Sequence, residues 1–177
     1  PYVFVGASTG GLIARQYTSR YPAEVGGMVL VDAISEAVQG RMKPRQFAFY
    51  NHYYLQSPSP ESTSYRDLEA IDFYRSFAEM RVTPLPPRHL PIVVLSNDWG
   101  FGDPAGVPPG FAHLVNRVWK RAQGYLIRLE PGVKQLTAQG SGHQIALNRP
   151  GLVARMTARV VGAVRYGKRL VPRRPHR

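Results

Sequence analysis

The chain has 177 residues, of which 44% are hydrophobic and 11% aromatic, a composition typical of one globular domain with a sizeable core. It contains no cysteine, which excludes a disulfide framework, a thiolate zinc site and a cysteine nucleophile. The formal net charge is +12, and no apolar run approaches the roughly 18 residues that a membrane-spanning helix needs.

The first residues predict a strand that turns sharply into a helix. Residues 2–5 are β-branched and aromatic, and the helix that follows ends before Pro22. Between them Gly6 and Gly10 flank Ser8 in a G-x-S-x-G pattern, which lets backbone segments pass close to a strained serine. We therefore take Ser8 as a candidate nucleophile, with a glycine-rich turn carrying an incidental serine as the alternative.

A second buried strand is predicted over residues 27–31, and it ends at Asp32. Strand, helix and strand within about thirty residues form a βαβ unit, whose two strands run parallel. Ser8 and Asp32 would then follow the carboxyl ends of neighbouring strands. Open α/β sheets bind their ligands at that edge.

From residue 34 to 90 the sequence shows no strand pattern, and aromatic residues alternate with polar ones. An amphipathic helix is predicted over 67–80, and we interpret the whole segment as a mostly helical lid whose aromatic side chains form its own core rather than substrate contacts. A third strand over 90–95, a helix over 111–123 and a fourth strand over 133–138 follow.

The fourth strand leads into Gly140–His143, a glycine-flanked turn with one histidine. A last helix is predicted from Asn148 as its N-cap, with apolar residues every four positions on one face. A serine hydroxyl needs a base to remove its proton and an acid to orient that base. The chain order of Ser8, a carboxylate and His143 fits this requirement.

These motifs resemble those of the α/β-hydrolases, of the type that carries a lid. The resemblance rests on 5–11 around Ser8, on 29–33 around Asp32, and on 140–143 followed by 148–150. It implies an α/β fold with about four parallel strands, the fifth to eighth of the family sheet, and flanking helices. The segments would be a nucleophile-elbow βαβ unit (1–33), a lid (34–90), the remaining core (91–164) and a basic tail (165–177).

The same resemblance implies that the sequence, which opens on Pro1, is the C-terminal half of its domain. Residues 3–5 would then be an exposed apolar sheet edge, which favours aggregation. We expect the 177 residues expressed alone to be inactive and poorly soluble.

The resemblance also assigns roles. Ser8 corresponds to the nucleophile, His143 to the general base, and the Thr9 N–H to one oxyanion donor. In most relatives the acid follows the seventh strand, a place that falls at Gly100 here, so Asp98 is early and Asp103 late. Some relatives carry the acid after the sixth strand, where Asp32 stands. Asp32 is favoured, and Asp98, Asp103 and Glu36 remain open.

The predicted activity is that of a serine hydrolase, of esterase or lipase type, acting on a small or medium apolar ester without cofactor or metal. Alternatives are attack on an amide, a lactone or a carbon–carbon bond, or a non-catalytic binding protein with this fold. The compartment is not assigned. No nucleic-acid partner is expected; six Lys and Arg in 165–177 indicate a solvated, disordered tail, with contact to anionic surfaces as the alternative.

Overall fold

The computed structural model describes residues 1–56, 71–87, 89–167 and 170. Four strands alternate with helices: β1 (Tyr2–Ala7), α1 (Thr9–Arg20), β2 (Val25–Val31), η1 (Glu36–Arg41), α2 (Pro44–Tyr50), η2 (Asn51–Leu55), α3 (Phe73–Val82), β3 (Ile92–Ser96), α4 (Phe111–Leu126), β4 (Lys134–Thr137), α5 (Ile145–Asn148) and α6 (Pro150–Tyr166). η1 is a 3-10 helix and η2 a π-helix. The predicted α/β fold with four strands is confirmed.

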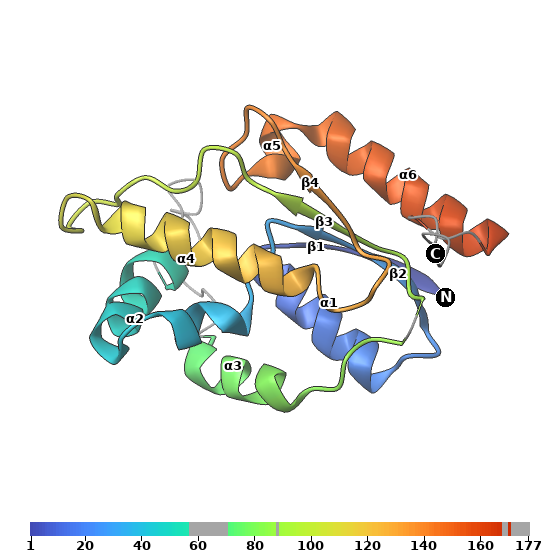
Figure 1. The fold of residues 1–177 in the computed structure, drawn as a ribbon, viewed down its shortest axis with the longest axis horizontal. Coiled ribbons are helices and arrows are strands. Elements are labelled where there is room, and N and C mark those ends of the chain that lie inside the picture. The colour runs from blue at the N-terminus through green and yellow to red at the C-terminus, as the bar shows by residue number, and fades with distance from the viewer. Residues whose placement is uncertain (57–70, 88, 168–169, 171–177) are drawn as a thin grey trace, which may run out of the picture.

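The strands form one parallel sheet in the order β1-β2-β3-β4. Val29 of β2 pairs with Val5 on one side and with Val93 on the other. Because all four strands run in the same direction, their carboxyl ends meet at one edge of the sheet (Figure 1). The residues that follow β1, β2, β3 and β4 are therefore brought together there.

Alternation along the central strands divides the core between two faces. Met28 and Leu30 of β2 pack toward α1 and the end of α4, whereas Val29 and Val31 pack toward α5 and α6. Figure 1 shows the same layers, with α6 on one side of the sheet and α1 and α4 on the other. A strand buried on both faces reads as a continuous apolar run, which is why residues 27–31 could be recognised in the sequence.

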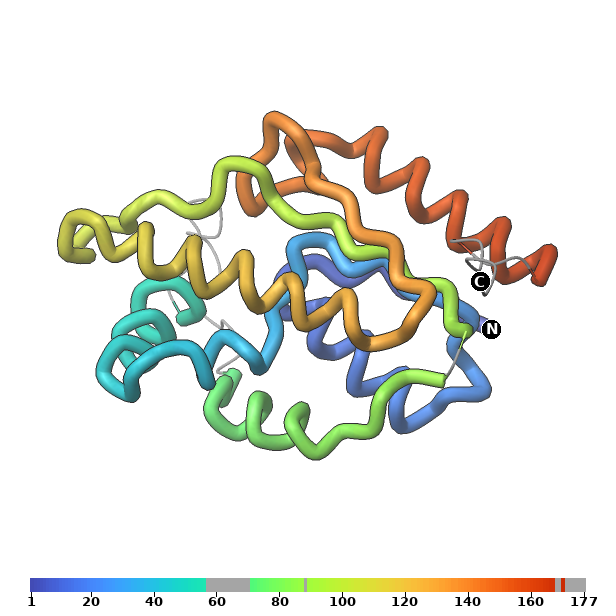
Figure 2. The backbone as a smooth tube through the Cα atoms, in the orientation of Figure 1, coloured from blue at the N-terminus to red at the C-terminus, as the bar shows by residue number. Residues whose placement is uncertain are grey.

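Between β2 and β3 the chain leaves the sheet and runs through η1, α2, η2 and α3 (Figure 2). These helices share an apolar cluster with α1 and α4, in which Phe47, Tyr50 and Phe77 are almost fully buried. The aromatic residues of this segment thus lie in a core that it shares with α1 and α4.

Two helix starts differ from the predictions. α6 begins at Pro150 with Arg149 as its N-cap residue, so the prediction of Asn148 as N-cap is wrong, because residues 145–148 already form the short helix α5. α3 begins at Phe73, where the side chain of Asp72 accepts a hydrogen bond from the Arg75 N–H. The part of the predicted helix over 67–70 lies outside the described residues.

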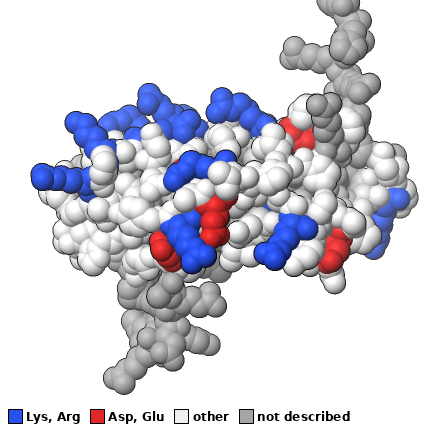
Figure 3. All heavy atoms as spheres, turned by 90° about the horizontal axis from the view of Figure 1, so that it is seen from below, with Lys and Arg blue, Asp and Glu red and all other residues white. Residues whose placement is uncertain are grey.

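Positive charge is not confined to the chain end. The exposed side chains of Arg117, Lys120 and Arg121 lie on α4, while Glu130 is buried with 4% of its surface exposed. Figure 3 shows Lys and Arg spread over one face of the molecule with fewer Asp and Glu between them.

Most of the predicted tail at 165–177 lies outside the described residues. Within the described part, no helix is long and apolar enough to cross a membrane.

Candidate active site

Ser8 stands in a strained turn between β1 and α1. Its φ of 49° and ψ of −119° are unusual for a residue with a side chain. Three backbone hydrogen bonds hold it there: its N–H donates to Val31 O, and its carbonyl accepts from Gly11 N and Ile34 N. The backbone of β2 and of the residues after it therefore fixes a conformation that an isolated serine would avoid.

Close packing at this turn depends on Gly6 and Gly11 rather than on Gly10. A Cβ at Gly6 would lie 2.6 Å from the carbonyl oxygen of Gly10, and a Cβ at Gly11 would collide with the side chain of Ala33. A Cβ at Gly10 would have no neighbour within 4 Å. The first glycine of the G-x-S-x-G pattern thus has the predicted steric role, whereas Gly11 takes over the role expected of Gly10.

Asp32 follows β2 and also has a positive φ, of 42°. Its N–H donates to the Leu95 carbonyl at 2.7 Å, and its side chain is fully buried. Among the described residues, Ser8, Asp32 and His89 are the non-glycine residues with positive φ. Backbone strain of this kind gathers at functional sites.

The Asp32 carboxylate lies at the centre of a hydrogen-bond network. Oδ1 accepts from the Asn97 N–H at 3.1 Å and from the Trp119 indole Nε1–H at 3.0 Å. Oδ2 accepts from the Asn97 amide Nδ2 at 2.7 Å and lies 2.7 Å from Nδ1 of His143. Four donor groups therefore surround a carboxylate that solvent does not reach.

His143, the third partner of Asp32, is partly open to solvent, with 25% of its side chain exposed. Because an ionised carboxylate can only accept, Nδ1 carries the proton in this contact and Nε2 of the neutral ring is left as an acceptor. Phe101 and Trp119 pack against the imidazole, with ring centroids 5.0 and 5.6 Å away. The ring is thus fixed by one hydrogen bond and two aromatic neighbours.

The loop that carries His143 is tied to the end of β3. Backbone N–H groups of Asp98 and Trp99 donate to the Ser141 carbonyl at 2.9 and 3.2 Å. The buried Ser141 hydroxyl lies 2.9 Å from the Gly142 carbonyl and 3.2 Å from the Asn148 side chain. Asn148 therefore stabilises this loop, although it does not cap α6.

The other candidate acids have different partners. Asp98 accepts from the Gly140 N–H at 2.9 Å. Asp103 accepts from the N–H groups of Gly110 and Ala112, and these two bonds hold the pKa of its carboxyl below the ordinary range. Glu36 forms a buried pair with Arg15 at 2.8 Å. Of the four carboxylates considered, the structure brings Asp32 to His143.

Thr9 is the first residue of α1 and directly follows Ser8. No side chain caps this helix, and the first N–H groups of a helix have no partner within it. The positive end of the helix dipole lies at the same place. The Thr9 N–H is therefore suited to stabilise negative charge that develops beside Ser8.

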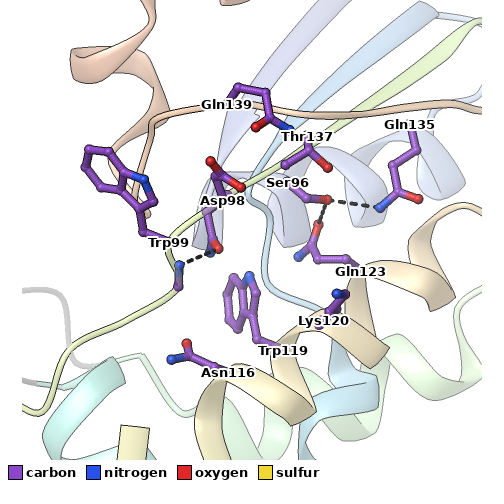
Figure 4. A pocket seen from close by; sticks show the side chains of 12 residues that line it. Ser96, Asp98, Trp99, Asn116, Trp119, Lys120, Gln123, Gln135, Thr137 and Gln139 are labelled. Carbon is purple, nitrogen blue, oxygen red and sulfur yellow. Dashed lines mark hydrogen bonds between the residues drawn. The ribbon is translucent and has the colours of Figure 1, made fainter. Parts of the chain in front are cut away.

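A polar cavity of about 350 Å³ lies between α4 and the ends of β3 and β4 (Figure 4). Its wall includes Asn97 and Trp119, two of the three residues that donate to Asp32, together with Lys120. Figure 4 shows Trp119 rising from α4 toward the end of β3. Two of the residues that bind Asp32 therefore line this cavity, whereas the carboxylate itself is fully buried.

Asn97 and Trp119 were not predicted from the sequence as site residues. They stand 65 and 87 positions away from Asp32, after β3 and within α4. A polar residue directly after a buried strand is a signal that could have pointed to Asn97. Trp119 was expected only to face inward, because helical periodicity does not show which carboxylate an indole N–H reaches.

Similar solved structures include a probable hydrolytic enzyme of Pseudomonas aeruginosa, with 16% identity, a TM-score of 0.49, and coverage of 89% of this chain and 62% of that one. A carboxylesterase structure from Nitrososphaera gargenis has 16% identity, a TM-score of 0.49, and coverages of 93% and 66%. A metagenome-derived lipolytic enzyme has 15% identity, a TM-score of 0.50, and coverages of 90% and 64%.

The chain thus spans just under two thirds of the length of these three structures. The search of curated proteins gave no match. Residues 1–99, more than half of the sequence, match the family model described as the alpha/beta hydrolase fold. The chain belongs to the α/β-hydrolase fold family.

Proposed function

We propose that this chain carries the catalytic triad of a serine esterase, with Ser8 as nucleophile, His143 as general base and Asp32 as the orienting acid. The observation that carries the proposal is the 2.7 Å contact between His143 Nδ1 and the fully buried carboxylate of Asp32. The strained backbone of Ser8 supports it, because such strain presents a nucleophile at the end of a strand.

In the proposed reaction, the Ser8 hydroxyl attacks the carbonyl carbon of an ester while Nε2 of His143 takes its proton. The tetrahedral intermediate collapses to an acyl-serine, and the alcohol leaves with the proton from His143. Water then attacks the acyl group by the same route and releases the carboxylic acid. Asp32 stays ionised throughout and holds the imidazolium through Nδ1–H.

The Thr9 N–H is the proposed oxyanion donor. It lies at the free end of α1, immediately after the nucleophile, so its position does not depend on a mobile side chain. Removing one such donor in a serine hydrolase lowers kcat by about 100- to 1000-fold. A backbone donor cannot be deleted by side-chain substitution, which is why the test below rests on the triad.

The substrate class we propose is a small or medium apolar ester. The surroundings of His143 are aromatic, since Phe101 and Trp119 pack on its ring and Tyr54 packs on Phe101. Aromatic neighbours of the proposed general base favour an apolar acyl group over a charged one.

The test is hydrolysis of nitrophenyl esters of increasing acyl length by the whole protein that carries this chain. Ser8→Ala and His143→Ala should each lower kcat by at least about 1000-fold. Matched controls are Ser19→Ala on α1 and His113→Gln on α4, which should leave kcat within about twofold. Full activity of Ser8→Ala would contradict the proposal, and hydrolysis of the esters with long acyl chains only would contradict the proposed substrate class.

A further inference from the structure

Trp119 makes a contact that packing alone does not require. Its indole Nε1–H donates to Oδ1 of Asp32 at 3.0 Å, in a place where Trp119 is 4% exposed and Asp32 is fully buried. Its ring also stands edge-on to His143, at an interplanar angle of 86°. One side chain of α4 thus touches both the carboxylate and the imidazole.

The hydrogen bond matters because Asp32 is fully buried, so its charge is not solvated by bulk water. In a fully buried carboxylate, negative charge is stabilised only by the donors that surround it. Asn97 supplies two of them and His143 the third, which leaves Oδ1 with one side-chain donor, the Trp119 indole. Without this donor the carboxylate could rotate about its χ2 angle, and its charge would act more strongly on the histidine.

We propose that Trp119 is a positioning residue of the active site, whose indole N–H fixes the Asp32 carboxylate and limits how strongly it holds the protonated His143. The inference rests on the proposed triad. It adds to the triad a residue of α4, a helix that carries no member of the proposed triad, and it gives the indole N–H a role separate from the role of the aromatic ring in packing.

The test uses Trp119→Phe in the whole protein that carries this chain. Phenylalanine keeps an aromatic ring near His143 and Phe101 but removes the N–H donor together with the second ring of the indole, so the loss of packing has to be measured separately. We expect kcat to fall about 10- to 100-fold with KM unchanged, because a hydrogen bond to a charged group is lost. The acid limb of the kcat/KM profile should move to higher pH, since a less stabilised carboxylate holds the imidazolium more tightly.

The chain offers a matched control, because it has two tryptophans. Trp99 is 70% exposed, and Trp99→Phe removes the same donor from the surface. This variant should keep the wild-type kcat and pH profile. A loss of packing alone in Trp119→Phe would lower the melting temperature without moving the acid limb, and that result would overturn the inference.

A second readout does not depend on activity or on the stability of the variant. In the wild-type protein, two indole N–H signals are expected from this chain in a proton–nitrogen NMR spectrum. The Trp119 signal should titrate at the same pH as the ring protons of His143, while the Trp99 signal should not. A Trp119 signal whose chemical shift stays constant while His143 titrates would overturn the inference.

The two proposals can fail separately. If esters are not hydrolysed but the Trp119 signal follows His143, the esterase proposal fails and the coupling through Asp32 stands. If esters are hydrolysed through Ser8 but Trp119→Phe has the wild-type kcat and pH profile, the inference fails alone.

Discussion

Asp32 is the residue on which the site depends most. Its carboxylate is fully buried and accepts hydrogen bonds from Asn97, Trp119 and His143. Each donor therefore stabilises a negative charge that bulk solvent does not reach. Asn97 directly follows β3, and the resemblance predicted that the acid would lie in the segment after this strand. Here that strand end supplies two donors to an acid that stands after the preceding strand, β2.

Replacement of Asp32 by asparagine should therefore lower the rate of ester hydrolysis strongly. The amide would keep the shape of the carboxylate but could not accept hydrogen bonds at both ends, and it could not stabilise the protonated His143. We expect kcat for ester hydrolysis to fall about 1000- to 10,000-fold in Asp32→Asn. The matched control is Asp98→Asn, because Asp98 accepts one hydrogen bond from a loop N–H and is exposed. Equal losses in both variants would contradict the role given to Asp32.

The sequence allowed Ser8 and His143 to be chosen, because each stands in a glycine-flanked turn after a recognisable strand. The choice among Asp32, Asp98, Asp103 and Glu36 could not be made from spacing. It depends on the register of β2 against β3 and on where α4 places Trp119, and both are long-range properties. Local patterns thus predict strand ends and turns, but not which side chains meet across them.

At the scale of elements, the close packing of the turn between β1 and α1 depends on Gly6 and Gly11, and Gly6 can be tested against Gly10. Gly6→Ala should cost about 1–3 kcal/mol of unfolding free energy, because its Cβ would meet backbone atoms of Gly10 that cannot move aside. Gly10→Ala is the matched control: it lies in open space within α1 and should be neutral or stabilise by up to about 1 kcal/mol. Urea unfolding measures both, and a larger loss in Gly10→Ala would contradict this account.

The buried pair of Arg15 and Glu36 joins α1 to η1. Both side chains are buried, at 6% and 3% exposed, and two hydrogen bonds of 2.8 and 2.9 Å connect them. Burial by itself would raise the pKa of Glu36, but the bonds and charge of Arg15 outweigh it, so the pKa lies below its ordinary value. The pair therefore fixes the start of the proposed lid against the helix that follows Ser8.

Glu36→Gln should cost about 3 kcal/mol at pH 7, because it leaves the Arg15 charge buried without a carboxylate. A group with a lowered pKa in the folded state stabilises the fold above its unfolded pKa, and this contribution is lost as the pH falls. The difference between wild type and Glu36→Gln should therefore shrink below about pH 4.5. The control is Glu79→Gln in the exposed Arg75–Glu79 pair, for which we expect at most about 0.5 kcal/mol. Equal effects of the two substitutions in urea unfolding would contradict the role of burial.

At the scale of the whole molecule, β1 is an end strand of the described sheet and pairs with β2 alone. Tyr2 and Val5 are 61% and 47% exposed, and they line an apolar hollow with Phe4, Ile13 and Tyr17. An apolar strand edge of this kind pairs readily with other strands. The edge predicted from the sequence is thus present in the 177 residues.

We expect the 177-residue chain to associate through this edge. Val5→Lys should shift the molar mass in light scattering toward the monomer, because a charged side chain on an edge strand opposes pairing with another copy. Val82→Lys on α3, where Val82 is 83% exposed and outside the sheet, is the control and should leave the association unchanged. A wild-type chain that is monomeric at high concentration would contradict this prediction.

The overall architecture was more predictable than the site. Continuous apolar runs identified the central strands, and the βαβ order required parallel pairing, because crossover helices separate the strands. The short helix α5 was missed, since four residues are too few to show a helical period. The packing of η1, α2 and α3 against α4 could not be predicted either, because an apolar face in the sequence does not show which element packs against it.

The measurement that tests the central proposal most directly is labelling with a fluorophosphonate, followed by intact mass and peptide mapping, on the folded whole protein that carries this chain. We predict a single adduct on Ser8, absent in Ser8→Ala, strongly slowed in His143→Ala and Asp32→Asn, and unchanged in Asp98→Asn. A folded protein that takes up no label, or takes it up at a residue other than Ser8, would contradict the assignment of Ser8, His143 and Asp32 as a catalytic triad.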